Sequence, residues 1–217
     1  MGISAMFSKK YAKFYNIFNS KKPYQEEINF VYRWAGRPKT IFDIGCGTAN
    51  YWKFYPYGVQ VVGIEKSKAM IGGDNSIIQG DITKYKCPLM GYFDCATALF
   101  DVVNYIPQHD WWKHIPIKRG GSFIFDVWDK KKVDSDGFLE TFRSVDGNFR
   151  IISPLNYDGK RVDLRIECIS ADGVAEEEHR MYVHSHEDIK RFCGKEFEIV
   201  EVKPTKNWQT WYLCRRK

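Results

Sequence analysis

The chain has 217 residues, 44% of them hydrophobic and 28% charged, and a net charge of +6 from lysines spread along its length. This composition fits a one-domain globular protein and favours solubility over a dedicated basic docking surface. We expect a cytoplasmic protein without a membrane partner, because no apolar segment could act as a secretory leader or a membrane span. The six cysteines are scattered, with no C-x-x-C pair and no zinc-spaced Cys/His cluster, so we expect buried free thiols and no metal.

The N-terminal region, residues 1–36, predicts two helices. Tyr11, Phe14, Tyr15 and Phe18 recur at helical spacing and therefore share one face. Such a face either packs on the core or closes over a ligand, and the sequence leaves both interpretations open. A second amphipathic helix is expected over residues 24–36.

An apolar run over residues 41–44 reads as a buried strand that ends in a glycine-rich turn. Gly45 and Gly47 stand one residue apart there, and glycine lets a backbone turn tightly against a ligand. The dinucleotide fingerprint G-x-G-x-x-G requires a third glycine where this chain has Asn50. That difference weakens an NAD interpretation, although Glu65 stands at the right distance to bind a ribose.

Four further strand-and-loop motifs follow the first in a regular order. The five are DIGCGT (43–48), VVGIE (61–65), IQGDI (78–82), FDCATA (93–98) and GGSFIFD (120–126). In order and spacing they resemble the class I S-adenosylmethionine (SAM)-dependent methyltransferases over most of residues 25–130. The resemblance implies an α/β fold: a Rossmann-like, seven-stranded, mostly parallel sheet with helices on both faces and an antiparallel final strand.

Beyond residue 138 the pattern changes to short strands that alternate apolar with polar residues. Asp-Gly pairs at 146–147, 158–159 and 172–173 are typical of hairpin turns, so we expect a small antiparallel β insertion over 138–184. A helix over 185–193 and strands over 197–203 and 208–215 should complete a single domain spanning 1–217. The insertion resembles the β-rich cap of small-molecule N-methyltransferases, and a dimerisation element is the alternative.

The resemblance implies SAM as the cofactor and S-adenosylhomocysteine as the product. Glu65 would accept hydrogen bonds from the ribose hydroxyls, and Asp81 with Ile82 would hold the adenine. Tyr11 and Tyr15 would close over the cofactor as part of a helical lid in residues 1–36, because a tyrosine ring suits a sulfonium cation. The other predicted cofactor residues lie in the motifs or just after them: Asp43, Gly45, Cys46, Gly47, Lys66, Met70 (at the start of an expected helix), Leu99 and Phe100.

The acceptor should lie at the carboxyl ends of the fourth and fifth strands, where ligands bind in open α/β sheets. Asp126, at a strand end, is the best-placed candidate base, and Tyr105 is a second predicted catalytic residue. Predicted acceptor contacts are Asn104, Trp128, Arg180 and Tyr182, with Arg180 suited to a carboxylate or phosphate. The remaining candidate bases, of which each histidine is better explained as a surface or structural residue, are Asp101, His109, His114, His179, His184 and His186.

The function implied by the resemblance is methyl transfer from SAM to a small-molecule acceptor. N-methylation is favoured over O-methylation, because an amine needs little beyond orientation and a route for its proton, whereas a hydroxyl needs a general base. One alternative is an RNA- or protein-modifying methyltransferase, although the chain lacks the Asp/Asn-Pro-Pro-Tyr and Pro-Cys motifs of two nucleic-acid subclasses. Another is a non-catalytic SAM- or NAD-binding protein. Assembly as a homodimer is left open.

Overall fold

The structure is a computed structural model that describes residues 7–107, 110–138, 140–171, 173–205 and 208–217. None of the helices in these ranges has the length and apolar character that a membrane span requires. In chain order the elements are α1 (Lys9–Asn19), α2 (Tyr24–Trp34), β1 (Thr40–Ile44), η1 (Trp52–Phe54), β2 (Gln60–Glu65), β3 (Ile77–Gln79), β4 (Phe93–Ala98), η2 (Val102–Tyr105), η3 (Asp110–His114), β5 (Ile117–Trp128), α3 (Lys130–Asp136), β6 (Thr141–Val145), β7 (Asn148–Tyr157), β8 (Arg161–Ser170), β9 (Gly173–Tyr182), α4 (His186–Cys193), β10 (Phe197–Pro204) and β11 (Gln209–Arg216).

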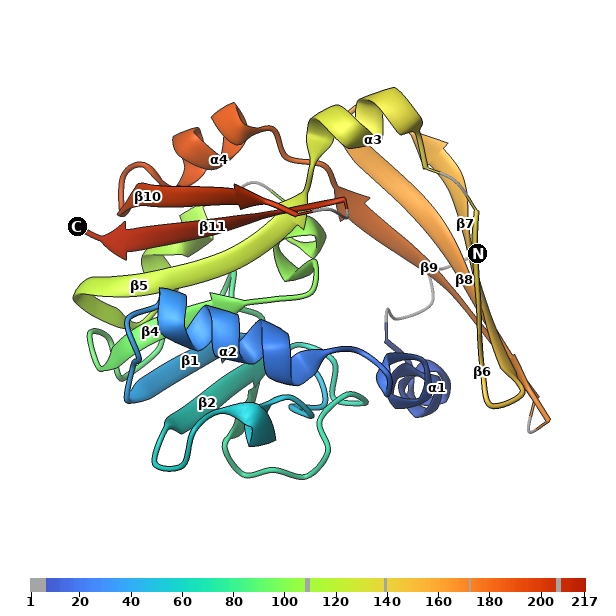
Figure 1. Ribbon diagram of the computed structural model, residues 1–217, viewed down its shortest axis with the longest axis horizontal. Coiled ribbons are helices and arrows are strands. Elements are labelled where there is room, and N and C mark those ends of the chain that lie inside the picture. The colour runs from blue at the N-terminus through green and yellow to red at the C-terminus, as the bar shows by residue number, and fades with distance from the viewer. Residues whose placement is uncertain (1–6, 108–109, 139, 172, 206–207) are drawn as a thin grey trace.

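Seven strands form the central sheet in the spatial order β10-β11-β5-β4-β1-β2-β3. The strands from β5 to β3 pair in parallel, whereas β11 is antiparallel to both β5 and β10. Parallel pairing brings the carboxyl ends of β1, β2, β4 and β5 to one edge, the edge that binds ligands in open α/β sheets. The predicted seven-stranded sheet with an antiparallel final strand is confirmed (Figure 1).

The two faces of this sheet bury different layers, because side chains alternate along each strand. On one face, Ile41 and Ile124 pack against α2 and the segment around η1. On the other, Phe42 and Phe123 pack with η3 and α4. Helical segments therefore cover both faces, as the predicted fold requires.

One expected helix is absent from the described residues. Met70 was expected to begin a helix, but residues 68–70 form a turn and residues 71–76 contain no helix. Gly72 and Gly73 stand two and three residues after Met70, and Gly73 has a φ of +85°. Each glycine in a helix interior costs about 1 kcal/mol relative to alanine, so a short segment with two of them favours turns.

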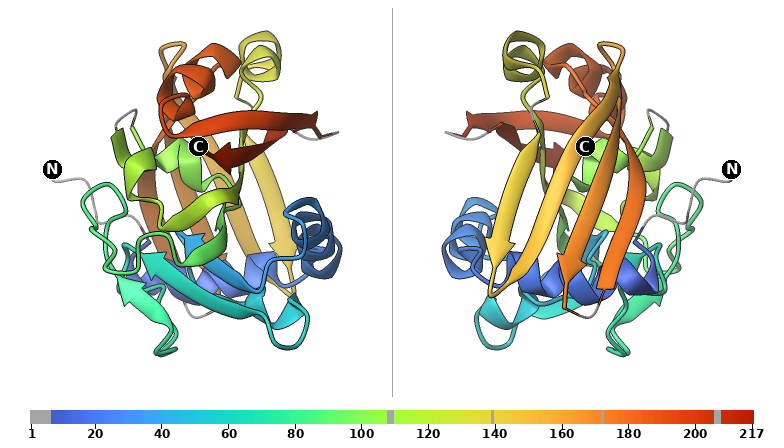
Figure 2. Two further views of the ribbon diagram at one scale, coloured as in Figure 1. Left: turned by 90° about the vertical axis from the view of Figure 1, so that its left-hand side faces the viewer. Right: turned by 90° about the vertical axis from the view of Figure 1, so that its right-hand side faces the viewer.

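A second sheet of four antiparallel strands, β6 to β9, forms the predicted insertion. Its first two hairpins turn at Gly147 and Gly159, which have φ of +76° and +87°. Helix α1 packs on the inner face of this sheet through Tyr11, Phe14 and Phe18. Figures 1 and 2 show that α1 lies between the second sheet and the core, so it bridges the two parts of the molecule.

Candidate active site

The loop after β1 has the backbone that its glycines predict. Gly45 and Gly47 have φ of +64° and +55°, in the left-handed region that favours glycine. A Cβ at Gly45 would lie 2.7 Å from both methyl carbons of Val102, so only glycine fits there. At Gly47 the nearest atom to such a Cβ is the terminal carbon of Met70, at 3.6 Å. The loop therefore presents bare backbone at the end of β1.

Glu65 ends β2 beside this loop and is buried. One carboxylate oxygen accepts a hydrogen bond from the amide of Gly47 at 2.9 Å, and the other accepts from the amide of Ser67 at 2.7 Å. Burial raises the pKa of this carboxyl, although the Ser67 and Gly47 amides oppose the shift. Each carboxylate oxygen has two lone-pair directions, so one on each remains for a ribose hydroxyl. The residues at this position fit the ribose of SAM.

Asp43 lies within β1 and is fully buried. It accepts hydrogen bonds from the Tyr51 hydroxyl, from the Trp52 indole N–H at 2.7 Å and from the Thr97 hydroxyl at 2.8 Å. Burial raises the pKa of Asp43 to about 6, against the effect of these three donors. In this arrangement Asp43 fastens the segment after the glycine loop to β1 and β4, and it acts on a cofactor only through that loop.

Asp81 follows β3 at the same edge of the sheet. It accepts from the Thr83 amide at 3.0 Å and the Thr83 hydroxyl at 2.7 Å, and its second oxygen lies 3.0 Å from the ammonium of Lys66. Burial alone would raise the pKa of Asp81, but the bonds from Thr83 and Lys66 outweigh it and lower the pKa. An ionised acceptor at this position fits the adenine amino group.

Four of the remaining predicted cofactor residues are buried. Cys46, Met70, Ile82 and Leu99 are buried core side chains. Any contact that Cys46 or Leu99 makes with a cofactor must therefore come from the backbone. All six cysteines are buried free thiols, as expected.

Helix α1 is hydrogen-bonded to the glycine loop through Asn16, in the C-terminal half of the helix. The side-chain oxygen of Asn16 accepts from the Thr48 hydroxyl at 3.0 Å and from the Asn50 amide at 2.7 Å. Tyr11 and Tyr15, the predicted lid tyrosines, lie on the same helix. Burial raises the pKa of Tyr11 to about 12 and that of Tyr15 further, so both remain neutral phenols.

Hydrogen bonds continue from Glu65 through the N-terminal segment to the second sheet. The Ser67 hydroxyl donates to the carbonyl of Phe7 at 2.7 Å. The amides of Phe7 and Ser8 both donate to the carboxylate of Glu177 on β9, at 2.9 and 2.7 Å. The segment that precedes α1 therefore joins the acid at the end of β2 to an acid of the second sheet.

Glu177 is the end of a series of three side chains in contact with one another. Its carboxylate lies 2.9 Å from Nε2 of His179, and Nδ1 of His179 lies 2.7 Å from the hydroxyl of Tyr105 on η2. Burial would raise the pKa of Glu177, but the bonds from His179, Ser8 and Phe7 outweigh it and lower the pKa. Burial holds the pKa of Tyr105 well above its usual range. The two predicted candidates Tyr105 and His179 are thus in direct contact.

Asp126 is fully buried, and both of its carboxylate oxygens accept hydrogen bonds. They accept from the amides of Phe100 at 2.7 Å and Asp101 at 3.0 Å, and the Gln209 amide donates to the second at 3.2 Å. Phe100 and Asp101 have φ of +67° and +66°, which is unfavourable for non-glycine residues. Asp126 therefore holds the strained loop after β4, and this corrects its predicted role as the base: it positions Asp101.

Asn104 is also a structural residue. It is fully buried, donates to the carbonyl of Tyr182 at 2.6 Å and accepts from the amide of Trp128 at 3.2 Å. It thereby joins η2 to the ends of β5 and β9. Both polar atoms of its side chain are occupied, so the predicted acceptor contact is replaced by a bridging role. Trp128 packs on Phe138 beneath the second sheet, with ring centroids 5.2 Å apart.

Arg180 lies on the outer face of the second sheet. Along β9 the buried residues are Ala175, Glu177, His179 and Met181, and Arg180 alternates with them to the exposed side. Its guanidinium pairs with Asp163 at 2.8 Å. The structure thus places Arg180 on the exposed face beside Asp163, and its contact with an acceptor stays a prediction.

The other candidate histidines lie away from the series formed by Tyr105, His179 and Glu177. His114 is on η3, Nε2 of His184 donates to the Val103 carbonyl at 3.3 Å, and His186 lies 3.0 Å from the Tyr212 hydroxyl. Burial lowers the pKa of His184. His109 lies outside the described residues.

A lysine between α1 and α2 marks a cation-binding position beside the loop after β4. The ammonium of Lys22 lies 3.0 Å from the ring centroid of Phe100 and 3.5 Å from the carboxylate of Glu27. Burial lowers the pKa of Lys22, while Glu27, Asp126 and Asp101 oppose that shift. An aromatic face with acids around it is a favourable environment for an ammonium group.

A cavity of about 380 Å³ opens next to this position. Acidic and aromatic side chains line it together with one lysine, and the full lining is Glu26, Glu27, Phe30, Lys203, Pro204, Thr205, Gln209 and Trp211. Gln209 also donates to Asp101 at 3.0 Å, so the cavity borders the loop that Asp126 holds. Its volume is in the range of small-molecule sites.

Sequence reasoning missed Lys22, Ser67, Glu177 and Gln209. One signal could have found Glu177: it shares the parity of Ala175 and Met181 along an alternating strand, which places it on the buried face. The partners of Lys22, Ser67 and Gln209 lie in distant segments, so local pattern carried no comparable signal.

Comparison with known proteins identifies structures of the same fold but no relative by sequence. No family model matches the chain, and no curated protein matches it. A SAM-dependent methyltransferase from Clostridium acetobutylicum superposes with a TM-score of 0.78 at 20% identity, covering 95% of this chain and 99% of its own.

Two solved sugar-modifying enzymes share the fold. The amino pentose methyltransferase CalS10 from Micromonospora echinaspora, solved with SAM bound, has a TM-score of 0.68 at 17% identity and covers 100% of both chains. The sugar N-methyltransferase KedS8 from Streptoalloteichus has a TM-score of 0.68 at 16% identity, covering 95% of this chain and 93% of its own. The chain thus has the fold of the SAM-dependent methyltransferases, with the second sheet included.

Proposed function

We propose that this chain is a SAM-dependent methyltransferase that modifies an amine of a small molecule. The observation that carries the proposal is the contact between Glu65 and the amide of Gly47 at 2.9 Å, at the edge of the sheet that binds ligands in this fold. When bound, SAM supplies a methyl group activated on a sulfonium. The chain's residues hold and orient the reactants and exclude water: Glu65 and Asp81 hold the nucleoside, and Tyr11 and Tyr15 cover it.

An amine acceptor is favoured by the position that Lys22 occupies. Its ammonium lies against the ring of Phe100 and near Glu27, with Asp101 and Asp126 close enough to affect its pKa. An acceptor ammonium that displaced the Lys22 side chain would contact the same ring and the same acids. N-methylation is therefore the proposed reaction.

A small acceptor is favoured by the cavity beside Gln209 and by the second sheet, which covers this side of the core. CalS10 and KedS8 act on an amino pentose and a sugar nitrogen, so an amino sugar is the acceptor class proposed here.

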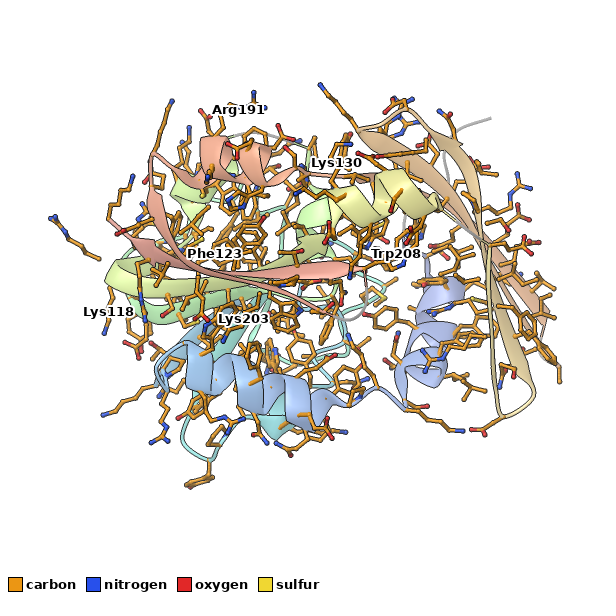
Figure 3. All side chains as sticks on the ribbon, turned by 45° about the horizontal axis from the view of Figure 1, so that its top comes forward. Lys118, Phe123, Lys130, Arg191, Lys203 and Trp208 are labelled. Atoms are coloured by element: carbon orange, nitrogen blue, oxygen red, sulfur yellow. The ribbon has the colours of Figure 1, made fainter. Side chains whose placement is uncertain are left out.

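A macromolecular acceptor is less favoured, because several of the surface cations that the structure describes are paired with acids and come from different elements. Lys118, Lys130, Arg191 and Lys203 come from four different elements (Figure 3) and pair with Asp94, Asp134, Asp188 and Glu201 at 2.6 to 2.9 Å. Paired, dispersed cations do not form the basic strip that binds a phosphate backbone.

The test is turnover on matched acceptors. The protein is incubated with SAM and with amino sugars, free and linked to a nucleoside diphosphate, and with the same sugars carrying hydroxyl in place of amine. Release of S-adenosylhomocysteine and the mass of the product are measured, with transfer RNA and a mixed protein extract as further acceptors. We expect methylation of an amino sugar and none of its hydroxyl analogue. Turnover confined to RNA or protein, or no turnover on any acceptor, would contradict the proposal.

A further inference from the structure

We propose that Tyr105, His179 and Glu177 form a proton relay that removes the proton of the acceptor's ammonium, with Tyr105 as the catalytic residue that touches the acceptor. This inference rests on the proposed function, since it concerns the same site. It assigns His179 and Glu177, on the inner face of the second sheet, a part in the chemistry as positioning residues that act through Tyr105.

The directions of the hydrogen bonds define the starting state. Glu177 is ionised and accepts from the amides of Phe7 and Ser8, so Nε2 of His179 must carry the proton that points to it at 2.9 Å. Nδ1 of His179 is then the acceptor for the Tyr105 hydroxyl at 2.7 Å. Tyr105 keeps a free lone pair on its oxygen, which can accept from an ammonium N–H.

Tyr105 is the member of the three that can reach an acceptor. As a whole residue Tyr105 is of intermediate exposure, whereas Glu177 and His179 are 2% and 1% exposed. It belongs to η2, which begins directly after Asp101. Its ring lies 5.4 Å from the ring of Phe7, which in turn lies 6.4 Å from the ring of Tyr15, so Tyr105 lies beside a predicted lid tyrosine.

The proton transfer balances without a further reactant. An N–H bond of the acceptor's ammonium breaks and its proton passes to the Tyr105 oxygen, while the Tyr105 proton moves to Nδ1 of His179. The resulting imidazolium is paired with the Glu177 carboxylate, so no unpaired charge is left buried. The electron pair freed on nitrogen forms the new carbon–nitrogen bond as the carbon–sulfur bond breaks, and that bond's pair stays on sulfur.

The N-terminal segment encloses the relay. The Phe7 ring lies 4.9 Å from the His179 ring and 5.4 Å from the Tyr105 ring, and the Tyr11 ring lies 5.6 Å from His179. The titratable groups that face His179 are thus Glu177 from its own strand, Tyr105 from η2 and Tyr11 from α1, and its neighbour across β8 is the uncharged Leu164. Docking of residues 7 and 8 both orients Glu177 and excludes water.

The experiment compares Tyr105→Phe and His179→Gln with wild type between pH 7 and about pH 9.5, around the range where free amines lose their proton. The substrate is whichever amino sugar of the panel above wild type methylates. We expect kcat at pH 7 to fall roughly 100-fold or more, the usual size of general-base catalysis, with the affinity for S-adenosylhomocysteine within about threefold. The defect should shrink as the pH rises, because the acceptor then arrives unprotonated. A merely structural role would give a loss that does not depend on pH.

A second Tyr–His pair provides matched controls. His186 and Tyr212 are 3.0 Å apart, and Tyr212 packs on the opposite face of the sheet from Asp126. Tyr212→Phe and His186→Gln should leave kcat and its pH dependence as in wild type. If they match the Tyr105 and His179 variants, the relay is overturned.

A readout that needs no acceptor is the nitrogen-15 NMR spectrum of His179 in the complex with S-adenosylhomocysteine, assigned with His179→Gln. We expect the proton on Nε2 and none on Nδ1 at pH 8. A proton on Nδ1 would overturn the relay, because His179 could not then accept one. Normal turnover by Tyr105→Phe would also overturn it while leaving the proposed methyltransferase intact, whereas a wild type that fails to bind S-adenosylhomocysteine would remove the proposed function itself.

Discussion

The carboxylate of Glu65 lies 2.9 Å from the amide nitrogen of Gly47, so the acid that ends β2 also fixes the glycine loop that follows β1. The second oxygen of the same carboxylate fixes Ser67, whose hydroxyl holds the N-terminal segment at Phe7. One side chain therefore orders the loop, the turn after β2 and the segment before α1. We expect cofactor binding and the position of α1 to be coupled through it.

We predict that Glu65→Ala weakens the binding of S-adenosylhomocysteine at least 10-fold without unfolding the protein. Hydrogen bonds to a charged group contribute about 1.5–3 kcal/mol each, and a decade in affinity corresponds to about 1.4 kcal/mol. Calorimetric titration measures the affinity, and circular dichroism checks the fold. Glu187→Ala, on the exposed first turn of α4, is the control. An unchanged dissociation constant for Glu65→Ala would make Glu65 a structural acid only.

The two glycines of the loop should differ in what alanine does to them. Both alanine variants carry the strain of a positive φ, about 1–2 kcal/mol. Gly45→Ala adds an overlap with the β-branched Val102 at 2.7 Å, whereas Gly47→Ala meets only Met70 at 3.6 Å. Urea unfolding should show Gly45→Ala to be less stable than Gly47→Ala by roughly 1–3 kcal/mol, the usual range for overpacking. Equal losses would mean that the loop relaxes around Val102.

Asp43 should make stability depend on pH in an unusual direction. Its pKa is raised by burial to about 6, so the folded state binds a proton that the unfolded state releases near its ordinary pKa of about 3.9. The contribution is present below about pH 4 and is lost as the pH rises through about 6. Relative to Asp43→Asn, wild type should therefore lose up to about 3 kcal/mol of unfolding free energy between pH 4 and pH 7.

Asp94 provides a control with the opposite sign. The bond from Lys118 is the main cause that lowers its pKa to about 2, so its contribution is present above about pH 4 and lost as the pH falls toward 2. Urea unfolding of wild type, Asp43→Asn and Asp94→Asn at a series of pH values tests both. Parallel pH curves for wild type and Asp43→Asn would show that Asp43 is not buried as described.

Helix α1 should respond to the cofactor if it is a lid. It is tied to the glycine loop through Asn16, and the segment before it is tied to Ser67. We predict that amide hydrogen exchange across residues 9–19 slows when S-adenosylhomocysteine is added, while exchange in α4 does not change. Exchange in α1 that ignores the ligand would leave it a packing helix and remove Tyr11 and Tyr15 from the site.

The sequence was informative wherever a local pattern determines position. The end of each apolar run in the sequence marks the end of a parallel strand. Gly45, Glu65 and Asp81 could therefore be assigned to one edge of the sheet from the sequence alone. The alternation after residue 138 and the Asp-Gly pairs likewise predicted the second sheet. The prediction of a helix at Met70 was wrong, because two nearby glycines favour turns.

The sequence could not predict which partner each polar side chain is hydrogen-bonded to. Asp126 reads as a free acid at a strand end, and only the fold shows that it is occupied by the amides of Phe100 and Asp101 in left-handed backbone. Glu177 and Arg180 lie in a run of charged residues, so only parity with Ala175 and Met181 distinguishes the buried Glu177 from the exposed Arg180. The contact of His179 with Tyr105 spans 74 residues, beyond the reach of any local pattern.

The most direct test of the central claim is a pair of calorimetric titrations of wild-type protein, with S-adenosylhomocysteine and with NAD. The missing third glycine at Asn50 and the ionised Asp81 both favour the first ligand. The account predicts S-adenosylhomocysteine binding with a dissociation constant on the order of 1 μM or tighter, about −8 kcal/mol, and no comparable binding of NAD. Tighter binding of NAD, or no binding of S-adenosylhomocysteine, would contradict it.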